Sequence, residues 1–145
     1  SSDEREIIEN ARAAASVALV TPPADFGLIH ADALRENVLI KGNDIWLIDF
    51  DDCAFGYRLF DVITALTKNE AEPDFPALRD ALLAGYRTMR PLDTKHWALM
   101  RLLRSFTYLG WIMPRMGEAG AAARSARFIA DALHHSNIYS VSCLT

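Results

Sequence analysis

A predicted β-hairpin most constrains how this chain can fold. Residues 37–40 and 45–48 read NVLI and IWLI, two runs rich in β-branched and bulky apolar side chains. The segment between them, residues 41–44, reads KGND, and its Gly and Asn can adopt the positive φ values of a tight turn. The sequence therefore predicts a hairpin over residues 37–48.

The segment that enters the hairpin carries polar side chains at a defined spacing. It reads IHADALREN (residues 29–37), so His30, Asp32 and Asn37 follow the pattern H-x-D-x-x-x-x-N. A carboxylate such as Asp32 can accept the proton of a substrate hydroxyl as its oxygen attacks phosphorus. The amide oxygen of Asn37 can bind Mg²⁺ without adding charge. The spacing, and the hairpin after it, match a kinase catalytic loop.

The segment that leaves the hairpin is acidic. It reads LIDFDDC, and Asp49 stands where the second strand ends, which is where kinase-type folds place a Mg²⁺-binding aspartate. Phosphoryl transfer needs a positioned alcohol and a metal that neutralises the phosphate charge. A lone Asp or Asn in a loop is an ordinary turn residue. The prediction of a metal-phosphate site therefore depends on the order in which four residues occur around one hairpin: His30, Asp32, Asn37 and Asp49.

The rest of the chain is predicted to be mostly helical. Residues 3–19 place small and apolar side chains at helical spacing with charges between them. Helical patterns then fill residues 57–135, with Asp74 as a candidate N-cap and an almost wholly apolar segment at 97–113. We therefore predict one domain over residues 1–145 that is mainly α with a small β-hairpin, an α+β fold.

Four polar side chains in the later helices have ordinary structural explanations. Arg101 and Arg104 are expected at the surface or in ion pairs, rather than as phosphate-binding groups. His134 and His135 are expected near a helix end, in contact with the helix dipole and solvent. Tyr108 and Trp111 are expected to pack in the core.

Composition excludes several classes of function. The chain has 145 residues, 51% of them hydrophobic and 23% charged, which is typical of a globular domain. A net charge of −4 gives no field that would attract nucleic acid or anionic lipid. No apolar run approaches the roughly 20 residues of a membrane span. Cys53 and Cys143 do not form a zinc or disulfide pattern, so a reducing cytoplasm is the expected location.

The two loops and the residues after them resemble a known family. IHADALREN followed by WLIDFDDCAFGYRLFD is similar to the catalytic half of aminoglycoside phosphotransferases and choline kinase-like small-molecule kinases. Members carry an H-G-D-x-H-x-x-N loop and an I-D-F-D/E segment, then a Gly and an Asp that opens a helix. The similarity is strong over residues 26–66. It implies a protein kinase-like C-terminal lobe, ATP as phosphate donor, Mg²⁺ as cofactor and a small-molecule alcohol as substrate.

The resemblance implies a role for six side chains. They are the catalytic base Asp32, the magnesium ligands Asn37 and Asp49, and the supporting residues His30, Asp51 and Asp61. Among the supporting residues, the Asp61 side chain would brace the catalytic loop from the next helix, and Asp51 would lie beside the metal within the loop 49–56. The chain departs from the family pattern at Ala31, where Gly is usual, and at Leu34, where many members have a second His.

The resemblance covers only part of a kinase. The chain contains neither G-x-G-x-x-G nor G-x-x-x-x-G-K-[ST], and its first lysine, Lys41, follows the catalytic loop. The first methionine is Met89. We therefore expect the N-terminal ATP-binding lobe to be absent from this chain and to be supplied in cis or in trans. Alone, the chain would be an inactive fragment.

Two alternatives stay open from the residues alone. A stand-alone C-terminal lobe could act as a non-catalytic binding module. The segment Asp49-Phe50-Asp51 also resembles the D-x-D of haloacid dehalogenase-type phosphatases, with Asp49 as nucleophile, although that fold needs further parallel strands. Among kinase substrates, the motifs leave aminoglycoside, choline, homoserine, a methylthio-sugar and a ketosamine open.

Overall fold

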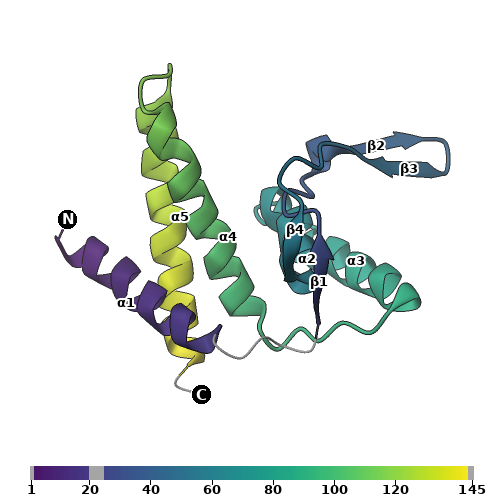
Figure 1. The fold of residues 1–145 in the computed structure, drawn as a ribbon, viewed down its shortest axis with the longest axis horizontal. Helices are drawn as coiled ribbons and strands as arrows, with labels where there is room; N and C mark the ends of the chain where they lie inside the picture. Colours follow the sequence, from purple (N-terminus) through teal and green to yellow (C-terminus); the bar gives the residue numbers. More distant parts are fainter. Residues whose placement is uncertain (1, 20–24, 144–145) are drawn as a thin grey trace. The chain divides into compact units, whose positions relative to one another are not determined.

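A computed structural model describes residues 2–19 and 25–143 of the chain (Figure 1). These residues form two compact units, each described here by itself. One unit consists of helices α1 (Ser2–Ala18), α4 (Trp97–Ile112) and α5 (Ala121–Ser142), with the 3-10 turn η3 (Met113–Arg115). The prediction of one domain over the whole chain stays a prediction.

The other unit holds all the strands of the described chain. Its elements are β1 (Phe26–Ile29), η1 (Arg35–Asn37), β2 (Val38–Lys41), β3 (Asp44–Leu47), β4 (Ala54–Tyr57), α2 (Arg58–Leu66), η2 (Thr67–Asn69) and α3 (Phe75–Met89). With most of the described residues in helices, the expected fold class is confirmed. No helix in residues 2–19 and 25–143 is both long and apolar enough to cross a bilayer.

The predicted hairpin is confirmed. Strands β2 and β3 pair antiparallel, with Val38 opposite Leu47 and Lys41 opposite Asp44. Gly42 has a φ of 62°, as the tight turn requires. The register places the chain that enters the hairpin and the chain that leaves it side by side at its base.

A second antiparallel pair was not predicted. Strand β4 pairs with β1, although residues 49–56 were expected to form only a loop. Neither strand is longer than four residues, and neither alternates between polar and apolar side chains. A Cβ at Gly56 would lie 2.5 Å from Cδ1 of Ile29, so the glycine leaves room for that buried side chain. Both pairs in the described chain are antiparallel, which does not fit the parallel sheet of a haloacid dehalogenase-type phosphatase.

Helices α2 and α3 follow the predicted pattern. The apolar stripe of α2 is buried, and its members are Leu59, Val62, Ile63 and Leu66. Helix α3 begins directly after Asp74, with Pro76 in its first turn. Asp74 occupies the N-cap position, as predicted. Its side chain makes no hydrogen bond to the first amides of the helix, so it does not cap them.

Helices α4 and α5 run side by side and supply much of the core of their unit (Figure 1). The rings of Tyr108 and Phe128 stack with their centroids 4.8 Å apart, and Tyr108 is partly buried against the core as expected. The same expectation was wrong for Trp111, which is 44% exposed. Helix α5 continues to Ser142, well beyond the predicted end at residue 135. The longer helix changes the surroundings of the histidines near its middle.

Buried polar side chains in this unit differ from the expectations in two respects. Arg101 and Arg104 were expected at the surface or in ion pairs, and their burial excludes the surface position. His135 is buried within α5 rather than solvated at its end. Nη2 of Arg101 lies 2.8 Å from Nε2 of His135. Burial by itself raises the pKa of Asp131, but the nearby His135 and Arg101 outweigh burial, so this pKa lies below its usual value.

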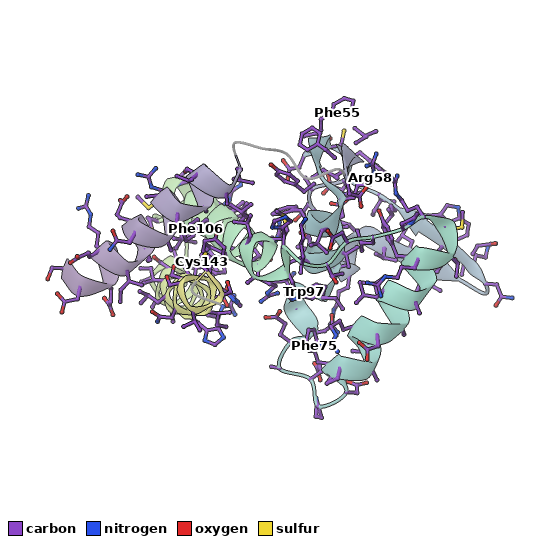
Figure 2. The ribbon with its side chains drawn as sticks, turned by 90° about the horizontal axis from the view of Figure 1, so that it is seen from below. Phe55, Arg58, Phe75, Trp97, Phe106 and Cys143 are labelled. Atoms are coloured by element: carbon purple, nitrogen blue, oxygen red, sulfur yellow. The ribbon has the colours of Figure 1, made fainter. Side chains whose placement is uncertain are left out.

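Two arginines, at the start of α2 and directly after α3, pair with an aspartate that precedes β1. Nη1 of Arg58 donates to Oδ1 of Asp25 at 2.9 Å and to the carbonyl oxygen of Phe26 at 2.8 Å. Nη2 of Arg90 donates to the same Asp25 oxygen at 3.2 Å. The guanidinium of Arg58 crosses the strand over Gly27, where an added Cβ would lie 1.8 Å from Nη2 of Arg58. Figure 2 labels Arg58 in this unit.

Replacing Gly27 with Ala should therefore destabilise the protein. The methyl group would displace the Arg58 guanidinium from Asp25 and leave a mostly buried carboxylate without its main partner, at a cost of about 1–3 kcal/mol. The control is Gly85→Ala, because a Cβ at Gly85 meets nothing within 4 Å and alanine favours helix α3. Denaturant unfolding of both variants measures the difference. Equal stability would contradict the role given to Gly27.

The loop before η1 contains a strained residue. Ala31 has a φ of 66°, which costs an alanine roughly 1 kcal/mol relative to a glycine. Ala31→Gly should therefore raise the free energy of unfolding by about 0.5–1 kcal/mol, because relief of strain outweighs the added freedom of the unfolded chain. Ala33→Gly on the same loop, where φ is not positive, should lower it instead. Urea unfolding compares the two, and a loss of stability in Ala31→Gly would refute the strain.

Candidate functional site

The catalytic-loop residues Asp32 and Asn37 are in direct contact. The amide Nδ2 of Asn37 donates to the backbone carbonyl of Asp32 at 2.9 Å and to its carboxylate Oδ2 at 3.2 Å. The chain reverses between them, because the backbone N–H of Leu34 donates to the Asp32 carbonyl and that of Asn37 donates to the Leu34 carbonyl. Asn37 is buried and Asp32 is partly exposed, so the loop presents the carboxylate from a fixed base.

Asp61 holds the start of this loop from the first turn of α2. Its Oδ2 accepts the backbone N–H of His30 at 2.7 Å, and its Oδ1 accepts the N–H of Ala31 at 2.8 Å. Both carboxylate oxygens thus bind consecutive amides, and bonds to a charged acceptor are the stronger kind. The contacts fix the backbone immediately before Asp32.

His30 links the loop to the end of the hairpin. Its Nε2 lies 2.9 Å from the carbonyl of Ile48, which can only accept, and its Nδ1 accepts the backbone N–H of Asp32 at 3.3 Å. Both contacts require the neutral ring with its hydrogen on Nε2. The ring also packs against Phe50, with centroids 4.5 Å apart. His30 is buried and therefore orients its neighbours from beneath the loop.

Asp49 follows the contact between the end of the catalytic loop and the residue that leaves β3. The backbone N–H of Ile48 donates to the Asn37 carbonyl at 3.0 Å, so Asp49 is one residue from a direct partner of Asn37. Asp49 is exposed and has a φ of 63°, which turns the chain sharply as it leaves the hairpin. Asp51 is exposed in the turn closed by the Cys53 N–H and the Phe50 carbonyl, and no hydrogen bond of the described chain joins it to the other candidate residues.

The oxygen donors at this point are suited to a hard cation. The Asn37 amide donates through Nδ2, which leaves its Oδ1 available as a ligand, and Asp49 offers an exposed carboxylate. In residues 2–19 and 25–143, no three His, Cys, Asp or Glu side chains gather closely enough to hold a metal. Magnesium is commonly bound through one or two protein oxygens together with nucleotide phosphates and water. The donor set fits that mode of binding.

One further contact at the loop had no signal in the sequence. Glu36 of η1 forms an ion pair with Lys68 of η2, which ties the catalytic loop to the end of α2. Partial burial raises the pKa of Glu36, but its hydrogen bond and charge interaction with Lys68 outweigh burial and leave the pKa lowered. The two residues lie far apart in the sequence, so only the fold reveals the pair.

Known proteins resemble this chain in sequence and in structure. Homoserine kinase of Pseudomonas aeruginosa strain PAO1 is 38% identical over 79 residues, which are 50% of this chain and 25% of that protein. The solved microcompartment-associated aminopropanol kinase superposes with a TM-score of 0.82 at 26% identity, over 98% of this chain and 47% of the other.

A second solved structure shows the same fold at lower identity. The amicoumacin kinase hAmiN, solved with AMP-PNP, Ca²⁺ and Ami, superposes with a TM-score of 0.68 at 23% identity, over 92% of this chain and 46% of the other. The chain spans about half the length of these solved kinases and a quarter of the homoserine kinase. The fold is that of the C-terminal lobe of kinase-like small-molecule kinases.

A family model gives the assignment directly. The model described as "Phosphotransferase enzyme family", or APH, matches residues 2–103, which include both hairpin loops and helices α1 to α3. The resemblance seen in the two loop motifs is thereby confirmed. The chain belongs to the phosphotransferase enzyme family of aminoglycoside phosphotransferase-like proteins.

Proposed function

We propose that the protein, together with an ATP-binding lobe, transfers the γ-phosphate of ATP to a hydroxyl group of a small molecule. The observation that carries this proposal is the contact between Asn37 and Asp32, because it joins a metal-ligand candidate to a base candidate. Membership of the phosphotransferase family supports the reaction class. The neighbours named as kinases support it as well.

Asp32 is the proposed catalytic base. Its partly exposed carboxylate can accept the proton of the attacking hydroxyl, while the Asn37 amide holds one carboxylate oxygen in place. The buried amide and the braced backbone reduce the freedom that the carboxylate must lose when substrate binds. Orientation of the alcohol is the main task of this part of a kinase.

Asn37 and Asp49 are the proposed magnesium ligands. Magnesium bound there with nucleotide phosphates would neutralise charge that develops on the transferred group. Asn37 offers its Oδ1, since its Nδ2 is occupied by Asp32. His30 and Asp61 position these residues through the Ile48 carbonyl and the loop amides. Asp51 would act only in support, from the exposed turn beside Asp49.

The relatives favour a small amino alcohol as substrate. Homoserine kinase and aminopropanol kinase are both named for compounds that carry an amine and a hydroxyl on a short carbon chain. We propose a substrate of that class for this protein. A phosphorylation screen would test homoserine and aminopropanol first, then choline and an aminoglycoside as larger alternatives.

The base assignment predicts the effect of Asp32→Asn in the protein expressed from its natural gene. Loss of the general base should lower kcat by about 10²–10⁴-fold, because the amide cannot take the hydroxyl proton. The affinity for Mg·ATP should stay within about twofold of the parent. Steady-state kinetics and nucleotide titration measure the two effects. The control is Asp44→Asn, which changes an exposed carboxylate at the start of β3. Full turnover in Asp32→Asn would exclude this residue as base.

The metal assignment predicts a different effect for Asp49→Ala. This variant should weaken nucleotide binding by about 10–100-fold in magnesium, because one ligand is lost. With the metal removed by chelation, the variant and the parent should bind nucleotide equally weakly. Calorimetric titration with and without magnesium measures this. Asp52→Ala removes a neighbouring exposed carboxylate and should bind as the parent does. Equal losses in both variants would point to general charge rather than to a ligand.

A further inference from the structure

Helix α2 and the turn η2 after it contact the catalytic loop near both of its ends. Asp61, in the first turn of α2, accepts two consecutive backbone N–H groups at the start of the loop. Lys68, in η2, forms an ion pair with Glu36 near the end of the loop. Asp61 and Lys68 are seven residues apart, about two helical turns, so both side chains leave the same side of this segment. One segment therefore contacts the loop before and after Asp32.

The end of the loop is the single 3-10 turn η1, which has little support of its own. The backbone N–H of Asn37 donates to the Leu34 carbonyl at 2.9 Å, and that of Val38 donates to the Arg35 carbonyl. Leu34 stands at the N-cap, and its side chain cannot cap the turn. A single turn fixes several backbone angles for few hydrogen bonds, so it is not stable by itself. Contacts from neighbouring elements must therefore hold η1 in place.

Lys68 comes from an anchored segment. Ile63 and Leu66, in the second half of α2, are buried. Where α2 passes into η2, Oγ1 of Thr67 donates to the carbonyl of Ile63 at 2.9 Å. The ammonium group of Lys68 therefore binds the Glu36 carboxylate from an element that is itself fixed.

The ion pair is exposed to solvent. The Lys68 side chain is 43% exposed and the Glu36 side chain is 48% exposed. Such a pair contributes little to the stability of a protein, because water competes for both charges and two long side chains lose freedom. Glu36 immediately precedes Asn37 in η1. The position of the pair, beside a candidate metal ligand, therefore indicates its role better than its strength does.

We propose that the Glu36–Lys68 ion pair positions Asn37 for magnesium binding, by holding η1 against the end of α2. This inference rests on the proposed function, which makes Asn37 a magnesium ligand. Glu36 and Lys68 are positioning residues, since they act through Asn37. Loss of the pair displaces Oδ1 of Asn37, and groups that orient a metal ligand affect the affinity for the metal.

Hydrogen exchange tests whether the pair holds η1 in the protein expressed from its natural gene. Lys68→Met removes the charge and keeps an unbranched side chain. It should speed exchange of the Asn37 and Val38 amides by roughly two- to fivefold, because the small contribution of an exposed pair then falls on local opening. The midpoint of urea unfolding should stay at the parent value. Lys68→Arg keeps the charge and should exchange as the parent does.

A matched control is available in the same unit. Lys95 forms an exposed ion pair with Asp93, at 3.6 Å between Nζ and Oδ2. Lys95→Met therefore makes the same chemical change away from η1. It should leave amide exchange in η1 and the magnesium dependence of nucleotide binding unchanged.

Calorimetric titration of nucleotide at several magnesium concentrations tests the effect on Asn37. Lys68→Met should raise the magnesium concentration for half-maximal binding by about two- to fivefold, while binding in chelator stays at the parent value. Glu36→Gln should have the same effect. The double variant should do no more than either single variant, because both substitutions break one pair. Lys68→Arg should restore the parent value.

Four outcomes would overturn the proposal. The first is unchanged exchange in Lys68→Met, and the second is an equal change in Lys95→Met, which would indicate a general effect of charge. The third is additive effects of Glu36→Gln and Lys68→Met, which would show that the two side chains act independently. The fourth is an unchanged magnesium dependence in Lys68→Met when Asp49→Ala does lose magnesium-dependent binding.

The proposed function can fail separately from this inference. If Asp49→Ala binds nucleotide in magnesium as the parent does, the metal assignment fails. The exchange rates then decide by themselves whether the pair holds η1. If Asp49→Ala loses affinity while Lys68→Met changes neither exchange nor magnesium dependence, the positioning role fails and the metal assignment stands.

Discussion

The candidate site depends on one carboxylate that accepts two consecutive backbone amides. Asp61 binds the N–H groups of His30 and Ala31 at 2.7 and 2.8 Å, and it does so from the rigid first turn of α2. The positive φ of Ala31 turns the backbone directly after these two amides. The Asp32 side chain follows directly, so its position relative to Asn37 depends on this bond pair. Asp61 and the strained Ala31 therefore both determine the backbone conformation immediately before Asp32.

Local patterns in the sequence predicted the elements that depend on local interactions. The hairpin followed from two β-branched runs and a Gly-containing turn, and the buried stripe of α2 followed from helical spacing. The motif spacing also predicted that His30, Asp32 and Asn37 would lie together, and the hydrogen bonds join these side chains and their backbone. In each case, the residues that determine the structure are close in the chain.

Features that depend on distant partners were not predictable in this way. Strand β4 exists because it pairs with β1, and its four residues carry no strand pattern of their own. The burial of Arg101 and His135 depends on the packing of α4 against α5, which makes charged or polar residues part of an interior. Phe55 on β4 is exposed and points away from its unit, as Figure 2 shows. An apolar side chain is therefore not a sufficient sign that a residue of this chain is buried.

The hairpin register has a consequence for which changes in chain length the site can accept. Asn37 and Asp49 both lie just beyond the base of the ladder, next to the pair Val38–Leu47, while the pair Lys41–Asp44 closes the tip. Extra residues inserted at Gly42 would lengthen the tip and leave the spacing at the base unchanged. One residue inserted within β2 would turn every later side chain of that strand to the opposite face and shift Asn37 against Ile48. Length variation among homologues should therefore be confined to the tip.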